Sequence, residues 1–117
     1  MLSACLYIRV STDEQAIRGF SQRKQHERLN KFCQSNSIKV INTVFEDYSA
    51  KSFNRPAWNR LMANFHQSKT QRPNLLLFTK WDRFSRNIAD AYYIISRLHE
   101  LRIEPQAIEQ PLDLSIP

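Results

Sequence analysis

The chain has 117 residues, of which 42% are hydrophobic and 24% are charged, so it is long enough for one domain with a real core. Seventeen Lys and Arg residues against eleven Asp and Glu give a formal net charge of +6, which favours a polyanionic partner, nucleic acid first, or else only a well-solvated surface. No apolar stretch is long enough to span a membrane and no secretory signal pattern is present, so we expect a soluble, cytoplasmic protein without a membrane partner.

The first half of the chain predicts a strand, a helix and a second strand. Leu2 to Val10 is an apolar run typical of a strand, and the polar loop after it contains the only glycine, Gly19. A helix is predicted from about Ser21, as N-cap, to Ser35, with one inward side formed by Gln25, Leu29, Phe32 and Cys33. Ile38 to Phe45 then predicts a second strand that ends at Glu46-Asp47.

The second half repeats this alternation. After a polar loop from Tyr48 to Arg55, Pro56 suits the first turn of a helix whose buried stripe would be Trp58, Leu61, Met62 and Phe65. Leu75 to Phe78 predicts a central strand covered on both faces. A polar turn from Trp81 to Asn87 precedes a helix, Ile88 to Leu101, with inward residues Ala91, Ile94, Ile95, Leu98 and Leu101, and Glu104 to Ile108 predicts a short fourth strand.

Strands that alternate with helices indicate an α/β fold. We expect three layers, with a mainly parallel central sheet of about four strands and helices on both faces. No linker, repeat or low-complexity tract divides residues 1–117, so we expect one domain, and Pro111 to Pro117 is expected to be irregular. The chain ends just after a strand, as a piece of a larger protein would.

The cysteines and histidines exclude two kinds of site. Cys5 and Cys33 lack an arginine at the C-x5-R spacing, where Ser11 and Lys39 stand, so the loop of a cysteine phosphatase is absent. We expect both cysteines to be buried thiols in a reducing compartment. The three histidines are scattered and no C-x2-C, H-x-H or H-E-x-x-H occurs, so zinc is not expected.

Basic and hydroxyl side chains follow each of the first three strands. Ligands of open α/β sheets bind beyond the carboxyl ends of the strands, so these side chains are expected to converge. The first strand supplies Arg9, Ser11 and Gln15; the second supplies Asp47, Ser49, Lys51 and Arg55; the third supplies Lys80, Asp82, Arg83 and Arg86. Several arginines that face a hydroxyl suit the binding of a phosphodiester and the stabilisation of its transition state.

Each of these residues also has a structural interpretation. Arg9 could only pair with a carboxylate, and Ser11 could begin a helix cap. Asp82 could cap the helix after the turn, and Ser49 could be a turn residue. Lysines such as Lys51 and Lys80 are more often solvated than catalytic, and Tyr7 is expected in the core. Arg83 and Arg86 lie near a helix start, where cations oppose the helix dipole, so ordinary surface charge explains them poorly.

Two other functions stay open at this point. Glu46, Asp47 and Asp82 could bind Mg²⁺ at the same edge, as in a metal-dependent phosphotransferase or nuclease, although the surplus of arginines favours metal-free chemistry. The chain could also be a non-catalytic basic module that binds nucleic acid while Ser11 is idle.

Three motifs resemble those of the serine recombinases of the resolvase/invertase type. Tyr7-Ile8-Arg9-Val10-Ser11-Thr12 is similar to the family's Y-x-R-V-S motif, Tyr48 to Pro56 is similar to its second loop, and Thr79 to Asn87 is similar to its D-R-x-x-R segment. They occur in the family's order and cover nearly the whole chain. The extended loop from Asp13 to Gln22 is more similar to the large and mobile-element serine recombinases than to the short resolvases.

The resemblance implies a resolvase-like catalytic domain that acts in site-specific DNA recombination. Ser11 would attack a DNA phosphate to give a 5′-phosphoserine and a free 3′ hydroxyl, with no cofactor, no metal and no external energy source. By position, Arg9, Arg55, Arg83 and Arg86 match the phosphate-binding and activating arginines and Asp82 matches the acidic residue. Gln15, Gln22 and Ser49 match polar residues around the site, with Lys51 and Lys80 as supporting basic residues.

The family also implies partners beyond this chain. Its members act on DNA as dimers that join into a tetramer, through a long helix and a DNA-binding region that this sequence lacks. We therefore expect an isolated catalytic domain, nucleoid-associated in its full-length form, that does not recombine DNA alone. Two positions depart from the family pattern, because Ala50 stands where many relatives have glycine and Ser85 stands where the small resolvases have glycine.

The residues leave the proton transfers open. A serine hydroxyl is a weak nucleophile, and no histidine lies in the three motifs to act as its base. The arginines would then activate the Ser11 hydroxyl, while Asp82 would either give a proton to the leaving oxygen or orient an arginine.

Overall fold

The protein is an α/β domain in which strands and helices alternate. The computed structural model describes residues 1–10, 18–47, 55–85 and 87–109. Its strands are β1 (Ser3–Val10), β2 (Lys39–Asp47), β3 (Leu75–Phe78) and β4 (Glu104–Ala107). Its helices are α1 (Arg18–Ser35), α2 (Pro56–Gln67), the short 3-10 helix η2 (Lys69–Gln71), α3 (Trp81–Phe84) and α4 (Ile88–Glu100).

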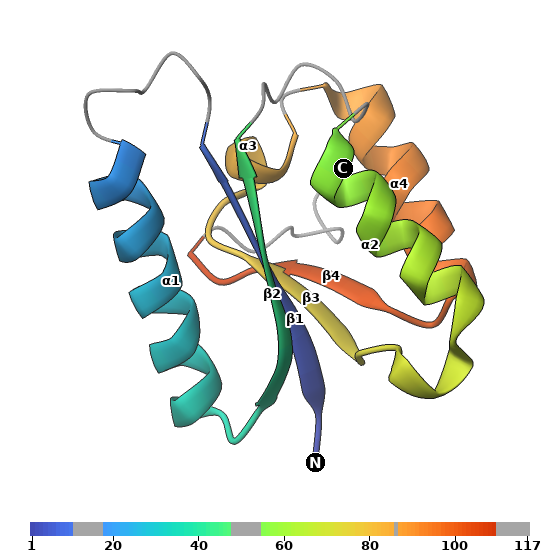
Figure 1. Cartoon of the computed structure of the whole chain (residues 1–117), viewed down its shortest axis with the longest axis horizontal. Helices are drawn as coiled ribbons and strands as arrows, with labels where there is room; N and C mark the ends of the chain where they lie inside the picture. The colour runs from blue at the N-terminus through green and yellow to red at the C-terminus, as the bar shows by residue number, and fades with distance from the viewer. Residues whose placement is uncertain (11–17, 48–54, 86, 110–117) are drawn as a thin grey trace, which may run out of the picture.

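The four strands form one sheet in the order β2-β1-β3-β4, and all three ladders are parallel. The expected parallel sheet of about four strands is therefore confirmed. β1 and β3 are the inner strands. β1 is buried from Ala4 to Val10 and β3 from Leu76 to Phe78, because an inner strand of a parallel sheet is covered on both faces. The carboxyl ends of β1 and β2 reach the end of the molecule at which α3 lies (Figure 1).

Helices cover both faces of the sheet, with α1 on one face and α2 and α4 on the other (Figure 1). Side chains of β1 alternate between these faces, since successive residues of a strand point to opposite sides. Cys5 and Tyr7 join the large core cluster under α2 and α4, whereas Ala4, Leu6 and Ile8 join the small core cluster under α1.

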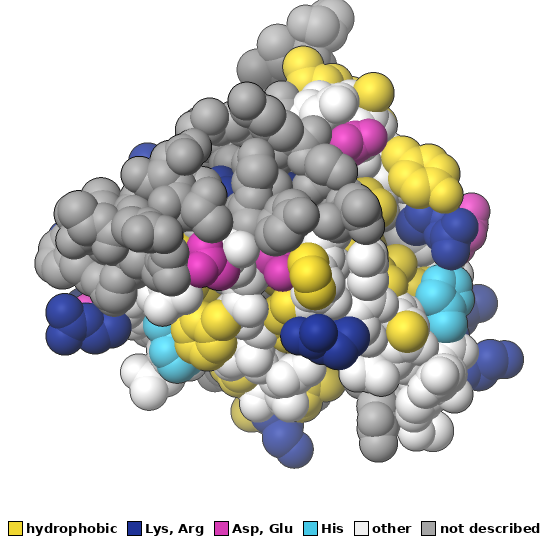
Figure 2. Space-filling model, turned by 45° about the horizontal axis from the view of Figure 1, so that its top comes forward, with side chains coloured by type: hydrophobic (Ala, Val, Ile, Leu, Met, Phe, Trp, Pro, Cys, Tyr) yellow, Lys and Arg dark blue, Asp and Glu magenta, His cyan; other side chains and the backbone are white. Residues whose placement is uncertain are grey.

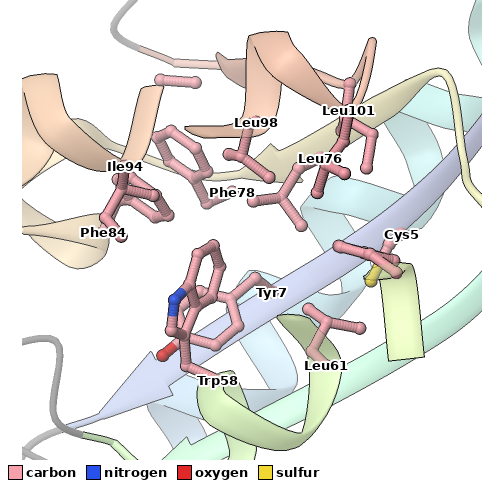
Figure 3. Close-up of a cluster of buried hydrophobic side chains, with 13 residues drawn as sticks. Cys5, Tyr7, Trp58, Leu61, Leu76, Phe78, Phe84, Ile94, Leu98 and Leu101 are labelled. Atoms are coloured by element: carbon pink, nitrogen blue, oxygen red, sulfur yellow. The ribbon is translucent and has the colours of Figure 1, made fainter. Parts of the chain in front are cut away.

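The large cluster is mostly aromatic near the carboxyl end of the sheet. Tyr7 packs edge-on against Trp58 and Phe84, with ring centroids 5.2 and 6.2 Å apart, and Phe84 stacks on Phe78 at 4.5 Å (Figure 3). Such pairs add stability beyond the area that they bury. The predicted stripe of α2 is confirmed, because Trp58, Leu61 and Phe65 are buried and Met62 is partly buried against the cluster.

Both long helices that lead into edge strands end in the same way. Ser37 after α1 and Arg102 after α4 have φ angles of 55° and 62°. After α4, the N–H of Arg102 donates to His99 and that of Ile103 donates to Leu98; the N–H groups of Ser37 and Ile38 do the same at the end of α1. These paired bonds are the Schellman motif, which satisfies carbonyl groups at the helix end.

Two predicted boundaries are wrong. Ser21 is not an N-cap, because α1 begins at Arg18 and includes Gly19. Glycine disfavours a helix by only about 1 kcal/mol relative to alanine, which a long helix outweighs. The segment from Trp81 is not only a polar turn, since it forms α3 and its Phe84 is fully buried. Of the inward residues predicted for α4, Ile94, Leu98 and Leu101 are buried, while Ala91 and Ile95 are half-buried.

Candidate active site

The carboxyl ends of β1 and β2 meet in register. Arg9 pairs with Glu46 and Val10 with Asp47, and only 3% of either Arg9 or Glu46 is exposed. Arg9 lies two residues after Tyr7, so it belongs to the face of the sheet that α2 covers. A buried arginine and a buried glutamate therefore stand side by side at the edge where the sequence predicts the active site.

Arg55 is fully buried just before α2. Its Nη1 donates to the Tyr7 hydroxyl at 3.0 Å, and its Nη2 donates to the Phe84 carbonyl at 2.7 Å. The guanidinium carbon lies 5.9 Å from the centre of the Tyr7 ring, within the range of a cation–π contact. The planar fork of one arginine thus connects β1 to the end of α3.

Glu46 accepts three hydrogen bonds from two elements. Its Oε1 accepts from the Tyr7 hydroxyl at 3.0 Å and from the Trp58 N–H at 2.8 Å, and its Oε2 accepts from the Ala57 N–H at 3.1 Å. The two N–H groups belong to the first turn of α2, where a helix has free donors and a positive dipole end. Arg55, the N-cap residue, makes no side-chain capping bond, so Glu46 of β2 caps this helix from outside it.

The environment of Tyr7 keeps its hydroxyl protonated. Burial raises the pKa of Tyr7 well above its usual range; the positive charge of Arg55 opposes this rise, and the negative charge of Glu46 adds to it. The single proton of the hydroxyl goes to Glu46, and its oxygen accepts from Arg55. Tyr7 is in the core, as predicted, and it also carries a polar link that the sequence analysis did not foresee.

Helix α1 holds the exit of β1 from the other face of the sheet. Gln25 is buried and its Nε2 donates to the backbone carbonyl of Arg9 at 3.1 Å. This bond lies two residues before Ser11, and it helps to fix the direction in which the strand ends. Gln22, a predicted site residue on the same helix, is half-buried.

The segment after β3 carries the third group of predicted site residues. Lys80 is exposed at the N-cap of α3, and Asp82 and Arg83 lie within that helix. Asn87, not Asp82, caps the helix that begins at Ile88, because its Oδ1 accepts from the Asp90 N–H at 3.2 Å. The alternative role of Asp82 as the cap of this helix is therefore wrong.

The remaining predicted site residues lie outside the described residues: Ser11, Gln15, Ser49, Lys51 and Arg86. Of the others, the structure brings Arg9 and Arg55 to the same end of the sheet, beside Glu46 and Tyr7. On the face that Figure 2 shows, the Lys and Arg side chains that are coloured lie apart from one another. Arg9, Glu46 and Arg55, by contrast, are buried charged residues at the end of the sheet.

Sequence reasoning missed Glu46 and Tyr7 as members of this site. The sequence suggests Glu46 only as a metal ligand, although its position two residues after Val44 puts it in phase with a residue packed against the core. An acid on the inward side of a strand needs partners, which is the signal that could have singled it out. Among the described residues, no three His, Cys, Asp or Glu side chains are grouped so that they could hold a metal ion.

The described helices include none that is both long and apolar enough to cross a membrane.

Comparisons with known proteins give the family. The family model described as "Resolvase, N terminal domain" matches residues 4–117. A curated relative, the "Uncharacterized immunity region protein 3" of Bacillus phage phi105, is 37% identical over 65 residues, which are 53% of this chain and 77% of that protein.

Solved structures agree with the family match. The N-terminal catalytic domain of TP901-1 integrase is 27% identical, with a TM-score of 0.77, over 91% of this chain and 76% of that chain. A resolvase family site-specific recombinase from Streptococcus pneumoniae has a TM-score of 0.81 at 24% identity, over 100% of this chain and 78% of that chain, and so shows the shared fold. The chain therefore belongs to the resolvase N-terminal domain family and has the fold of a serine recombinase catalytic domain.

Proposed function

We propose that this chain is the catalytic domain of a protein that cleaves and rejoins DNA strands in site-specific recombination, with Ser11 as the nucleophile. The Ser11 Oγ would form a bond to a DNA phosphorus while the bond from that phosphorus to the 3′ oxygen breaks. The serine proton leaves, and the departing 3′ oxygen takes up a proton, which gives a 5′-phosphoserine and a free 3′ hydroxyl. One phosphate ester replaces another, so the step needs no external energy and can be reversed on a new partner strand.

The observation that supports this proposal most strongly is the position of two buried arginines at the exit of β1. Arg9 is 3% exposed and Arg55 is fully buried, and Ser11 directly follows the strand that carries Arg9. Fixed cations in a site with little water stabilise the charge of a phosphorane-like transition state more strongly than solvated ones do. The family match extends the proposal to Arg83 and Arg86, which would hold the other phosphate oxygens, and to Asp82, which would serve the leaving oxygen or orient an arginine.

We further propose that the full-length protein acts on DNA as a dimer that joins into a tetramer, as the resemblance implies. The present chain would be its catalytic domain, with Gln15, Gln22, Ser49, Lys51 and Lys80 as supporting residues around the phosphate. The target sequence would be read by other parts of the protein, because an edge built from arginines contacts the DNA backbone.

The nucleophile is tested by trapping the covalent adduct. The full-length protein is expressed in its host, the cells are lysed in a denaturant, and DNA-linked protein is recovered, digested with nuclease and trypsin, and analysed by mass spectrometry. The expected product is a nucleotide phosphate on the tryptic peptide Val10 to Arg18, in which Ser11 and Thr12 are the only hydroxyl residues. Ser11→Ala is expected to abolish the adduct, and the exposed Ser35→Ala is expected to leave it unchanged.

The DNA of a portion of the adduct that is not digested with nuclease is sequenced, and an intact duplex of that sequence is the substrate for the metal test. Purified protein is incubated with that DNA in EDTA, and we expect the adduct to form as it does without chelator. Loss of the adduct in EDTA would support the metal-dependent alternative, and an adduct on any residue other than Ser11 would overturn the assignment. Strand exchange that survives Ser11→Ala would do the same.

A further inference from the structure

We propose that the groove between β2 and α2 binds an extended peptide of a partner protein. The peptide adds a strand to the outer edge of β2 and directs an apolar and an acidic side chain, two positions apart, into the groove. None of the proposed catalytic residues is among the described residues that line this groove, so the inference goes beyond the proposed function and is tested separately from it.

The outer side of β2 offers backbone groups to a further strand. In the sheet order β2-β1-β3-β4, no described strand pairs with that side. The Leu2 carbonyl accepts from the Lys39 N–H, so the even-numbered residues of β1 direct their backbone groups to β2. Leu6 lies opposite Thr43, and only one residue of such a pair bonds across a parallel ladder. The N–H and C=O of Thr43, and those of Phe45 two residues later, therefore point away from β1.

The sequence of this edge lacks the features that protect an exposed strand. Val40 to Phe45 reads Val-Ile-Asn-Thr-Val-Phe, with no charge and no proline. Segments of this kind pair readily with another strand. Its large apolar side chains also reach solvent, because Ile41 is 41% exposed and Phe45 is 47% exposed. The edge is thus suited to strand addition, the mode in which an extended peptide binds beside an edge strand.

Two adjoining hollows lie beside this strand, between β2 and α2. One has a volume of about 340 Å³ and is lined by apolar side chains that include Leu61 and Phe65. The other has a volume of about 290 Å³ and lies over Val44. Asn42, Leu61 and Asn64 line both hollows, so the two form one groove. Each volume is near the lower end of the range for ligand pockets, roughly 300–1,000 Å³.

The alternation of side chains sets the spacing of the peptide residues. Asn42 and Val44 line the groove, and Thr43 between them has outward backbone groups. A strand that bonds to Thr43 places two of its own side chains beside Asn42 and Val44, on the same face of the sheet. These side chains are two positions apart, and each enters one hollow. The register shift between Ala4 and Cys5 lies just before this stretch, so the peptide pairs with β2 from Asn42 onward.

The charges around the groove favour an acidic peptide. Arg60 is exposed and lines the hollow over Val44, and no Asp or Glu is among the described residues that line either hollow. Lys39, also exposed, begins the same strand. An acidic side chain of the peptide is therefore complementary to Arg60, whereas an apolar side chain fits the hollow beside Leu61.

A second copy of this chain fits the groove less well than a peptide. Two β2 edges that paired about a two-fold axis would bring the two copies of Arg60 toward each other, so like charges would meet. The hollows would also stay unfilled, because Asn42 and Val44 of each copy face their own α2. A peptide strand carries no such helix, so its side chains are free to enter the groove.

Binding is measured by fluorescence anisotropy with the full-length protein and two labelled, blocked peptides, TTETLTT and TTLTETT. The two orders sample both strand directions, and threonine favours an extended backbone. At least one peptide is expected to bind saturably at submillimolar concentration. Replacement of its glutamate by glutamine is expected to weaken binding by about 3-fold or more, through the lost attraction to Arg60. No saturable binding of either peptide would overturn the proposal.

Two pairs of variants test the contacts. Thr43→Pro removes an N–H that points away from β1, so it is expected to weaken binding by at least about 10-fold while the ladder to β1 remains. Thr43→Val, which keeps the N–H, is expected to bind as the wild type does. Arg60→Glu is expected to weaken binding by at least about 5-fold, and Arg102→Glu, an equal charge change on an exposed residue near the opposite edge of the sheet, is expected to have little effect.

A charge swap keeps the test decisive if Thr43→Pro lowers the folded fraction in urea. A peptide with lysine in place of glutamate is expected to bind Arg60→Glu more tightly than it binds the wild type. Binding that is unchanged in Arg60→Glu, or in folded Thr43→Pro, would overturn the proposal. So would a Thr43→Cys protein that forms disulfide-linked dimers under an added oxidant faster than the exposed Ser35→Cys control, because a second copy would then cover the edge.

Discussion

Two thiols lie in the core on opposite faces of the sheet. Cys5 belongs to the large cluster and is fully buried, and Cys33 belongs to the small cluster and is 2% exposed. Burial raises the pKa of the Cys5 thiol from 9.0 to about 12, and it raises the pKa of Cys33 in the same direction. Both residues therefore remain neutral thiols at physiological pH, and neither is a nucleophile in the folded protein.

These thiols predict a loss of stability in alkali. Above about pH 9 the unfolded chain releases the Cys5 proton while the folded chain retains it, so the free energy of unfolding falls as the pH rises toward 12. The decrease from this thiol has a slope of at most about 1.4 kcal/mol per pH unit. Urea titrations between pH 8 and 11 measure it, and Cys5→Ala is expected to have a shallower slope. An equal slope in the variant would show that Cys5 is not the cause.

At the residue scale, the sequence predicted which residues lie at the site better than it predicted their burial and their hydrogen-bond partners. The basic residues that follow the strands predict Arg9 and Arg55 at one edge of the sheet, and both lie there. The burial of Arg55 was not predictable, since it depends on the Tyr7 hydroxyl and the Phe84 carbonyl, which are 48 and 29 residues away in the sequence. Pairing between such distant groups is a property of the packed chain and is not visible in any local pattern.

At the scale of single elements, the two Schellman ends carry a conformational cost. Arg102 and Ser37 hold left-handed φ angles, which side chains with a Cβ atom disfavour and glycine does not. Helix α4 nevertheless needs this turn, because the bond from Ile103 to Leu98 brings the chain back into the sheet as β4.

We expect Arg102→Gly to stabilise the protein by up to about 1 kcal/mol, through relief of this backbone strain. The free energy of unfolding in urea measures the effect. Arg102→Ala is the matched control, because alanine removes the same side chain but keeps the Cβ atom, and it is expected to bring no gain. Equal stabilisation by glycine and alanine would place the cause in the arginine side chain instead.

The positions of the long elements were largely predictable and their ends were not. Pro56 marked the start of α2, and the apolar run from Leu75 to Phe78 marked β3, as both patterns are local. Helix α3 was not predicted, because a segment of four residues, Trp81–Phe84, is too short to show a periodic pattern. Its Phe84 is buried by the aromatic cluster, which forms only when α2, β1 and β3 have come together.

At the scale of the whole molecule, the sheet separates two cores. The large cluster lies between the sheet and helices α2 and α4, and the small cluster lies between the sheet and α1. Ile103 belongs to the large cluster and Ile8 belongs to the small cluster, and both are almost fully buried.

Because the clusters lie on opposite faces, we expect their mutational effects to be independent. Ile8→Val and Ile103→Val should each cost about 0.5–1.5 kcal/mol of unfolding free energy. The double variant should lose the sum, to within about 0.5 kcal/mol. Urea unfolding followed by tryptophan fluorescence provides the three values. A coupling larger than this would show that the sheet transmits packing changes from one face to the other.

The parallel sheet also determines the order in which the chain can fold. Every described ladder joins strands that a helix separates, so each one requires a crossover before it closes. β1 gains its first neighbour, β2, when residue 47 is available. Its other edge has no neighbour until Leu75 to Leu77 are available, about seventy residues after β1 itself. During synthesis, the strand that leads to Ser11 is therefore an apolar strand with one open edge for much of the time, which is the state in which nascent chains associate with one another.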